Sequence, residues 1–437
     1  METHALKEYV DLIREVFLYS RRFRNSNFVI KIDSPVIGDP CFPILVRDLA
    51  LLSENGTRII IIPGARERIN EILQSFGLEW EIYRNTRIAP EEAVPYIKMA
   101  AFDVANKVMT SLSAGKVNAV IGNWVRARAK GVIDGKDHMS AGIIEKIDLQ
   151  VIAKIMDQGL IPIFPCIGWN SMGKPYNISS DELAVFIASS LKAEKLFFIR
   201  KGGNFLSELA AAPKKGVVVN EGRVSRINAE AALPLLDDLE DNEEKRLLEL
   251  AVEACKNGVD RVHIVDGTTD GVMLKEIFSN QGIGALIHNN PFECIRQMKS
   301  EDVAEVMGLM NPLIDKAVLL PRTMEDLKNQ YKDYIVFEID STIRGCAAMH
   351  LFSGKCAEIA ALAVDQSYKH LGIGAKIVSY LLEDAAKKKQ KKVLALTTQS
   401  EDWFLQMGFK LGSAADLPPD RKPPGGRNSK ILVYPLT

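Results

Sequence analysis

The stretch AEIAALAVDQSYKHLGIGAKIVSYLL, residues 357–382, decides how the second part of the chain folds. An apolar run typical of a strand leads into a turn with Gly372 and Gly374, and an amphipathic helix follows at once. Glycines let a backbone approach a ligand closely, and the free N–H groups at a helix start point toward it. With the bases Lys369 and His370, this turn suits a pyrophosphate. Many strand–helix turns use glycine for geometry alone, so the motif by itself leaves both interpretations open.

The segments before this stretch follow one another without helices. The runs YIVFEID (334–340) and TIRGCAAMHLF (342–352) are strand-like and directly precede the strand at 357–364, so we expect antiparallel pairs. This unit begins after a break at HNNPFE, residues 288–293. Residues 291–437 then have the length of an ordinary domain.

The first 290 residues have a different pattern, in which strands and helices alternate. The runs FVIKI (28–32), RIIIIPGA (58–65) and EKLFFIR (194–200) are mainly apolar and do not alternate with polar residues, and helical segments lie between them. Continuous apolar strands are buried on both faces, which is typical of parallel sheets covered by helices. The sequence therefore predicts an α/β domain with a central, mostly parallel sheet.

Composition excludes several classes of partner. The chain has 437 residues, and its 55 Lys and Arg nearly balance 56 Asp and Glu, so no global field favours nucleic acid or a membrane. The six cysteines contain no CxxC, which predicts reduced thiols and no metal site. The N-terminal region lacks the apolar core of a signal peptide, and the longest apolar runs are strand-sized. We therefore expect a cytoplasmic protein.

The glycine turn resembles the coenzyme A loop of the GNAT superfamily of N-acetyltransferases. That family has the pattern Gln/Arg-x-x-Gly-x-Gly/Ala, and this chain has Lys369 at the first position. IRQMKSEDVAEVMGLM (295–310), CAEIAALAV (356–364) and WFLQMGFK (403–410) are similar to further parts of the family. The resemblance covers residues 294–437 and implies an α+β domain with a mixed sheet. It implies acetyl-CoA as a co-substrate and no tightly bound cofactor. Acetyl-CoA would contact Leu362, Ala363, Val364, Lys369, His370, Leu371, Gly372, Gly374 and Ala375. His370 could equally fill the turn.

Residues 1–290 resemble the amino-acid kinase family, acetylglutamate kinase most closely, but three phosphate-binding parts are altered. Asp33 and Ser34 replace two glycines after Lys31, Pro63-Gly64-Ala65 replaces a glycine triplet, and FFIRKGGN (197–204) replaces a Thr-Asp segment. An aspartate at position 33 would repel phosphate. These changes predict a kinase fold without kinase activity, in which Asn177 and Asp181 serve for helix capping and structural hydrogen bonding.

The combination of both domains resembles the bacterial-type N-acetylglutamate synthase family. This resemblance implies transfer of the acetyl group of acetyl-CoA to the α-amine of L-glutamate, as the first step of arginine biosynthesis. Glu358 has the family's position for the catalytic base, although it could be an ordinary exposed strand residue. Thr397 has the position of the hydroxyl that serves the leaving thiolate, and the neighbouring Thr398 stays an alternative.

Two arginines are implied as ligands of the glutamate carboxylates, Arg322 and Arg427, with backbone contacts at Ala361 and Leu396. Either arginine could instead be a solvated surface residue.

The same resemblance implies that L-arginine binds the kinase-like domain and inhibits by feedback. The effector residues would be Tyr19, Lys195, His263, Glu276, Ser279, Gly282 and Gly284. Alternatively, Tyr19 and His263 only pack in a core or interface. The apolar face between Val10 and Phe17 would permit the interlaced helices of a homo-oligomer, up to a hexamer.

Two other functions compete with this one. The chain could be an active acetylglutamate kinase with an accessory acetyltransferase domain, which the changes at Asp33 and Ser34 disfavour. It could also be an arginine sensor that acetylates another amine, which the intact Glu358 and glycine turn disfavour.

Overall fold

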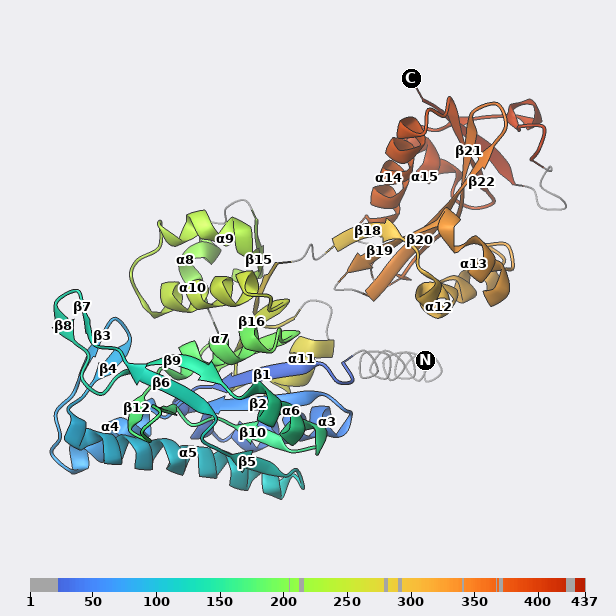
Figure 1. The fold of residues 1–437 in the computed structure, drawn as a ribbon. Helices are drawn as coiled ribbons and strands as arrows, with labels where there is room; N and C mark the ends of the chain where they lie inside the picture. Colours follow the sequence, from blue (N-terminus) through green and yellow to red (C-terminus); the bar gives the residue numbers. More distant parts are fainter. Residues whose placement is uncertain are drawn as a thin grey trace. The chain divides into compact units, whose positions relative to one another are not determined.

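The computed structural model describes residues 23–436 except 204, 212–215, 279–281, 290–292, 340–341, 367, 369–371 and 422–428. The chain forms two compact units, residues 1–290 and residues 291–437 (Figure 1). The helical pattern expected over residues 8–23 lies almost entirely outside the described residues. Among the described helices, none combines the length and apolar character needed to cross a bilayer.

A large, mostly parallel sheet organises the first unit, as the apolar runs predict. Strands β1 and β13 lie at its centre and are buried almost throughout, so their side chains contact helices on both faces. Helices α3 and α5 cover one face, and α7 and α10 cover the other (Figure 1). Only the pairs β14–β15 and β16–β17 are antiparallel. In sheet order the strands are β14 (Val217–Asn220), β15 (Arg223–Asn228), β17 (Ala285–His288), β16 (Arg261–Asp266), β13 (Lys195–Arg200), β1 (Asn27–Ile32), β2 (Arg58–Pro63), β10 (Ile161–Ile163) and β5 (Ala119–Ile121).

A second, smaller sheet in this unit was not expected from the sequence. It has the order β12 (Pro175–Asn177), β11 (Ile167–Trp169), β6 (Val125–Ala129), β9 (Gly142–Ile147), and two hairpins accompany it, β3 (Glu81–Tyr83) with β4 (Thr86–Ile88) and β7 (Val132–Ile133) with β8 (Lys136–Asp137). The helices of the unit are α2 (Ser34–Ile37), α3 (Phe42–Glu54), α4 (Arg66–Ser75), α5 (Val94–Ala114), α6 (Leu149–Asp157), α7 (Ser180–Ser190), α8 (Ser207–Ala211), α9 (Ala229–Leu236), α10 (Glu243–Lys256) and α11 (Val272–Phe278).

The second unit is a mixed sheet between two pairs of helices. Its first strands are antiparallel, as expected, and β21 with β22 is a parallel pair. Helices α12 (Val303–Asp315) and α13 (Met324–Gln330) pack on one face, and α14 (Ile373–Lys387) and α15 (Glu401–Gln406) pack on the other. The sheet order is β18 (Glu293–Gln297), β19 (Tyr334–Ile339), β20 (Thr342–Phe352), β21 (Cys356–Val364), β22 (Lys392–Thr397), β24 (Lys430–Pro435) and β23 (Lys410–Leu411).

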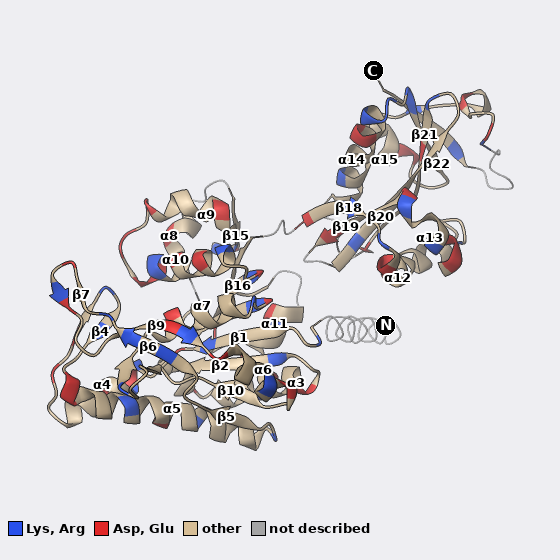
Figure 2. Ribbon diagram, in the orientation of Figure 1, with Lys and Arg blue, Asp and Glu red and all other residues tan. Residues whose placement is uncertain are grey.

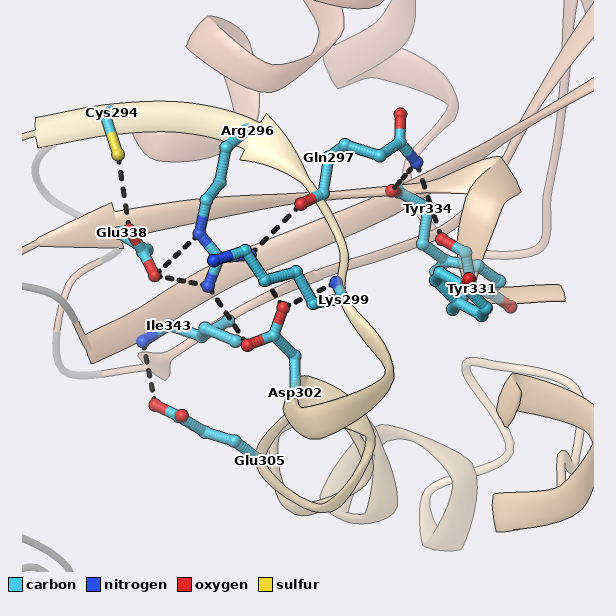
Figure 3. Close-up of polar contacts among 10 residues, drawn as sticks. All are labelled: Cys294, Arg296, Gln297, Lys299, Asp302, Glu305, Tyr331, Tyr334, Glu338 and Ile343. Carbon is cyan, nitrogen blue, oxygen red and sulfur yellow. Dashed lines mark hydrogen bonds and ion pairs between the residues drawn. The ribbon is translucent and has the colours of Figure 1, made fainter. Parts of the chain in front are cut away.

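A guanidinium fixes the start of α12 against the edge of this sheet. Arg296 on β18 donates to Glu338 on β19 and to both oxygens of Asp302, just before α12 (Figure 3). Glu305 in the first turn accepts from the backbone N–H of Ile343 at 2.8 Å. These contacts set the position of α12 over the strands that carry the candidate site. Both basic and acidic side chains are spread over each unit, in keeping with the net charge (Figure 2).

Candidate active site

Strands β21 and β22 separate in the middle of the second unit. Their shared ladder runs from Cys356 with Lys392 to Ile359 with Ala395. Further along, β21 pairs with β20, and β22 pairs with β24. Ala361 has a φ of 54°, and the register with β20 shifts nearby, which makes a β-bulge. Bulges often mark binding sites because they redirect strands. The parting strands place Leu362, Ala363 and Val364 beside the following turn.

The glycine turn begins α14, as predicted. Gly372 is the N-cap residue, with a φ of 65° that favours glycine, and it offers no side-chain cap to the first helical N–H groups. Gly374 and Ala375 lie in that first turn. A Cβ on Gly374 would lie 3.3 Å from the Trp403 ring, so close packing with α15 also requires glycine there. Lys369, His370 and Leu371 lie outside the described residues.

Glu358 lies on β21 one residue before the last β21–β22 pair, and it is buried, with 5% of its surface exposed. It is therefore not an ordinary exposed strand residue. Its neighbours Ala357 and Ile359 pack in the core under α14, so Glu358 faces the side of α12 and α13.

Arg421 holds both carboxylate oxygens of Glu358. Its Nε donates to Oε2 at 2.5 Å, and its Nη2 donates to Oε1 at 2.9 Å. The hydrogen bond to Glu358 raises the pKa of Arg421 above its usual value. Sequence reasoning missed this residue and chose Arg427 from the same loop. Arg427 lies outside the described residues.

Thr397 ends β22 on the opposite face from Glu358. Val393 and Ala395 pack under α14 and α15, and strand alternation puts Thr397 on their side. Its Oγ accepts from the backbone N–H groups of Gln399 at 3.3 Å and Ser400 at 2.9 Å. The hydroxyl hydrogen is then the group it can still donate. Thr398 is exposed, and Leu396 is half-buried on the face of Glu358.

Arg322 lies on the face of α12 and α13. It is half-buried, and its Nη1 donates to the carbonyl of Leu320 at 3.2 Å. Burial raises the pKa of the Tyr334 phenol, and the neighbouring Arg322 partly offsets that rise. Burial also raises the pKa of the Cys346 thiol, and Arg322 partly offsets that rise. Since Cys346 Sγ donates to the carbonyl of Ala361 at 3.9 Å, Arg322 lies near the bulge. It is not a fully solvated surface arginine.

In the first unit, three of the predicted effector residues form one buried chain. Lys195 Nζ lies 3.3 Å from His263 Nε2, and His263 Nδ1 lies 2.7 Å from Glu276 Oε1. Burial lowers the pKa of His263 to about 4, and the Lys195 charge acts in the same direction. At neutral pH the imidazole is therefore uncharged, and Nδ1–H donates to Glu276 while Nε2 accepts from Lys195.

Glu276 also organises the glycine loop after α11. Its Oε2 accepts from the backbone N–H groups of Ile283 at 2.7 Å and Gly284 at 3.0 Å. Burial raises the pKa of Glu276, but the hydrogen bonds from His263 and the two amides outweigh it, and the pKa is lowered overall. Gly282 has a φ of 60°, which favours glycine at that position. Tyr19 and Ser279 lie outside the described residues.

The altered kinase elements form a compact ion network. Lys31 pairs with Asp33 and with Asp181, the latter at 2.7 Å. Arg200 pairs with Asp33 at 2.9 Å and with Glu243 at 2.7 Å. Burial lowers the pKa of Lys31, but the two aspartates outweigh it and raise the pKa overall. The cations are thus neutralised by the protein itself.

One prediction at this network was wrong. Ser179, rather than Asn177 or Asp181, caps α7, and its Oγ accepts from the N–H of Glu182 at 3.3 Å. Asp181 comes after the cap, inside the first turn, where its carboxylate points to Lys31 instead. Its role is structural, but through an ion pair.

Comparison with known proteins agrees with both units. Residues 27–266 match the amino acid kinase family, and residues 309–409 match the acetyltransferase (GNAT) family. The chain is 31% identical over 440 residues to an amino-acid acetyltransferase of Neisseria meningitidis serogroup A, covering 98% of both chains.

Two solved structures of N-acetylglutamate synthase from Neisseria gonorrhoeae are also 31% identical, with 98% of this chain and 99% of those chains covered. The TM-score is 0.81 for the complex with coenzyme A and L-arginine and 0.60 for the complex with coenzyme A and N-acetyl-glutamate.

Proposed function

The chain belongs to the amino-acid acetyltransferase family, and from this premise we propose that it transfers the acetyl group of acetyl-CoA to the α-amine of L-glutamate, the first step of arginine biosynthesis. The observation that carries the proposal is the buried Glu358 carboxylate beside the point where β21 and β22 part. A solved relative of the same length binds coenzyme A and N-acetyl-glutamate, which would be the product of this reaction.

The reaction requires the ammonium of glutamate to lose a proton before attack. Glu358 takes that proton, directly or through one water molecule. The neutral amine then forms a C–N bond with the thioester carbonyl, the C–S bond breaks, and the proton that the nitrogen loses as the amide forms passes to the CoA thiolate. Thr397 donates its hydroxyl hydrogen toward the leaving CoA thiolate from the other face of the sheet.

Substrate binding uses two chemistries. Arg322 and Arg427 each pair with one carboxylate of glutamate, and backbone groups at Ala361 and Leu396 orient the amine. Acetyl-CoA lies along the backbone of residues 362–364, with its pyrophosphate over the turn at 369–375. The N–H groups at the start of α14 support this placement, because Gly372 leaves them without a side-chain cap.

Arginine acts as a feedback inhibitor through the first unit. The chain Lys195–His263–Glu276 supports this role, since it offers a cation for the effector carboxylate and a carboxylate for its guanidinium. Three hydrogen bonds already occupy Glu276, so its remaining acceptor position and the loop carbonyls near Gly282 complete the contact. We include Tyr19 and Ser279 among the effector contacts only because the family resemblance implies them. A solved relative binds L-arginine together with coenzyme A.

One assay tests the proposal. Thiol release from acetyl-CoA is measured across the amino acids, with and without arginine, and mass spectrometry identifies the acetylated product. We expect glutamate to be the best acceptor and arginine to inhibit. A different best acceptor would mean that glutamate is not the substrate, and ATP-dependent phosphorylation of acetylglutamate would revive the kinase alternative.

The mass in solution, with and without arginine, tests for a homo-oligomer up to a hexamer. Because the reaction consumes cellular acetyl-CoA, we place it in the cytoplasm.

A further inference from the structure

The carboxylate that the reaction needs already has a cationic partner. Arg421 donates from Nε and Nη2 to the two oxygens of Glu358, at 2.5 and 2.9 Å, side-on to the carboxylate. Bidentate pairs of this kind are the strongest arginine–carboxylate contacts in proteins. A carboxylate held in this way has no oxygen left without a proton donor.

A second cation has little room beside this pair. The side chain of Glu358 is 6% exposed, so an ammonium group cannot approach it from open solvent while the guanidinium stays in place. If both cations shared the carboxylate, two like charges would lie side by side in a poorly hydrated site, where their repulsion is strong. One carboxylate does take two cations elsewhere in this chain, since Asp33 pairs with both Lys31 and Arg200, but the Glu358 side chain is less exposed than that of Asp33, so the two cations compete for it.

Arg421 can leave Glu358 without unfolding its loop. The preceding residue, Asp420, accepts from the Ser353 hydroxyl at 2.7 Å and from the Ser353 backbone N–H at 2.9 Å. Ser353 lies in the turn between β20 and β21, so the backbone beside Arg421 is tied to the hairpin that carries Glu358. The side chain of Arg421 is itself 21% exposed, which gives its guanidinium a path into water.

We propose that Arg421 is an internal competitor of the amine substrate: its guanidinium and the substrate ammonium compete for the Glu358 carboxylate. The proposal rests on the proposed role of Glu358 as base. It assigns to Arg421 a positioning role: the residue keeps the buried carboxylate paired in the unliganded enzyme and lowers the apparent affinity for the amine.

Competition of this kind has a kinetic signature. If the carboxylate is free of Arg421 for about a tenth to a third of the time, the apparent affinity for the amine is reduced about 3- to 10-fold. Arg421→Ala should therefore lower the KM for glutamate about 3- to 10-fold while the KM for acetyl-CoA stays unchanged. Arg421→Lys, which keeps the charge but loses the bidentate geometry, should lie between wild type and Arg421→Ala.

Free guanidinium ion provides a second readout. At concentrations well below those that denature proteins, it should compete with glutamate in Arg421→Ala, because the space beside Glu358 is vacated. In the wild type, the same concentrations should have a much smaller effect, measured against NaCl at equal ionic strength. Lys410→Gln, at an exposed position of β23, removes the same charge elsewhere in the unit and should change neither KM.

Any other result for the Arg421→Ala kinetics overturns the proposal. A KM for glutamate that rises, or a kcat that collapses in a variant with a wild-type urea midpoint, would make Arg421 part of the assembled site. Unchanged kinetics would make the pair irrelevant to binding. If Arg421→Ala folds poorly, Arg421→Gln replaces it. If the enzyme prefers another amine, the proposed substrate is wrong, but the same KM comparison with that amine still tests Arg421.

Discussion

Two regions of the molecule correspond to phosphate-binding sites in related folds, and they differ in how their charges are satisfied. In residues 291–437, Gly372 begins α14 and offers no side-chain cap to the first N–H groups of the helix. In residues 1–290, Lys31 and Arg200 face the carboxylates of Asp33, Asp181 and Glu243. Cations attract phosphate only when their charge is not already neutralised. From this comparison we predict that the first site binds phosphate weakly, because its cations already have partners within the protein.

The largest expected effect is a loss of stability when the ion pairs of Lys31 and Arg200 with Asp33 are removed. Asp33→Ala leaves Lys31 and Arg200 each with one partner fewer, and removing one member of a buried ion pair costs about 3–5 kcal/mol. We expect urea unfolding of the first unit to show a loss of this size, with the KM for acetyl-CoA unchanged. Inorganic pyrophosphate should restore part of the stability, because the cations that have lost Asp33 can pair with it.

The control is a pair at the surface. Asp103→Ala removes one partner of Arg68. In this pair the side chain of Arg68 is 39% exposed and that of Asp103 is 53% exposed, and exposed pairs contribute about 0–1 kcal/mol to stability. Equal losses in both variants, or no rescue of Asp33→Ala by pyrophosphate, would contradict the pairing explanation.

The second effect tests whether the chemistry belongs to the unit with the uncapped helix start. Glu358→Gln keeps the size of the side chain but removes its basicity, so turnover should fall about 10²-fold or more at saturating substrates. Binding of acetyl-CoA, measured by calorimetry, should stay near that of the wild type. Glu383→Gln, exposed on α14, should leave turnover unchanged. Retained turnover in Glu358→Gln across neutral pH would mean that another group is the base.

The two units also show which features a sequence can predict. The central strands were predicted because runs such as residues 28–32 and 357–364 are apolar at every position but one. The small sheet of β12, β11, β6 and β9 was missed because its strands have three to six residues and no clear period. Such strands depend on their tertiary neighbours rather than on their own pattern.

The site was predictable in part for a similar reason. Glu358 and Gly372 lie inside a motif, so their positions follow from the local sequence. Arg421 lies 63 residues from Glu358 in a loop without a motif, and no local pattern signals that contact. Likewise, the identity of Asp181 was visible, but its ion pair with Lys31 depends on how β1 and α7 pack.

A third prediction concerns the specificity of the second unit. Arg427→Ala removes one charge-assisted contact to glutamate, which costs about 1.5–3 kcal/mol, or about 10- to 150-fold in affinity. We expect the KM for glutamate to rise by that factor and the KM for acetyl-CoA to stay nearly constant. An equal rise in both constants would mean that the residue supports the loop and does not contact the amino acid.

The smallest expected effect is on inhibition by arginine, the function that we propose for the first unit. Arginine bound near Lys195, His263 and Glu276 can inhibit only if it binds two states of the enzyme with different affinity. A coupling of about 1–3 kcal/mol is typical. Glu276→Ala removes the acceptor of His263 and of two loop amides, so inhibition should disappear while turnover without arginine stays near normal.

Two further variants sharpen this last test. His263→Asn should weaken inhibition less, since Glu276 keeps its contacts to the loop amides of Ile283 and Gly284. Glu253→Ala, exposed on α10, removes a carboxylate from the same unit and should leave inhibition intact. Linkage adds a requirement that no structural defect can imitate: if arginine weakens glutamate binding by some factor, glutamate weakens arginine binding by the same factor. Calorimetry that detects arginine binding unchanged in Glu276→Ala would place the effector elsewhere in the molecule.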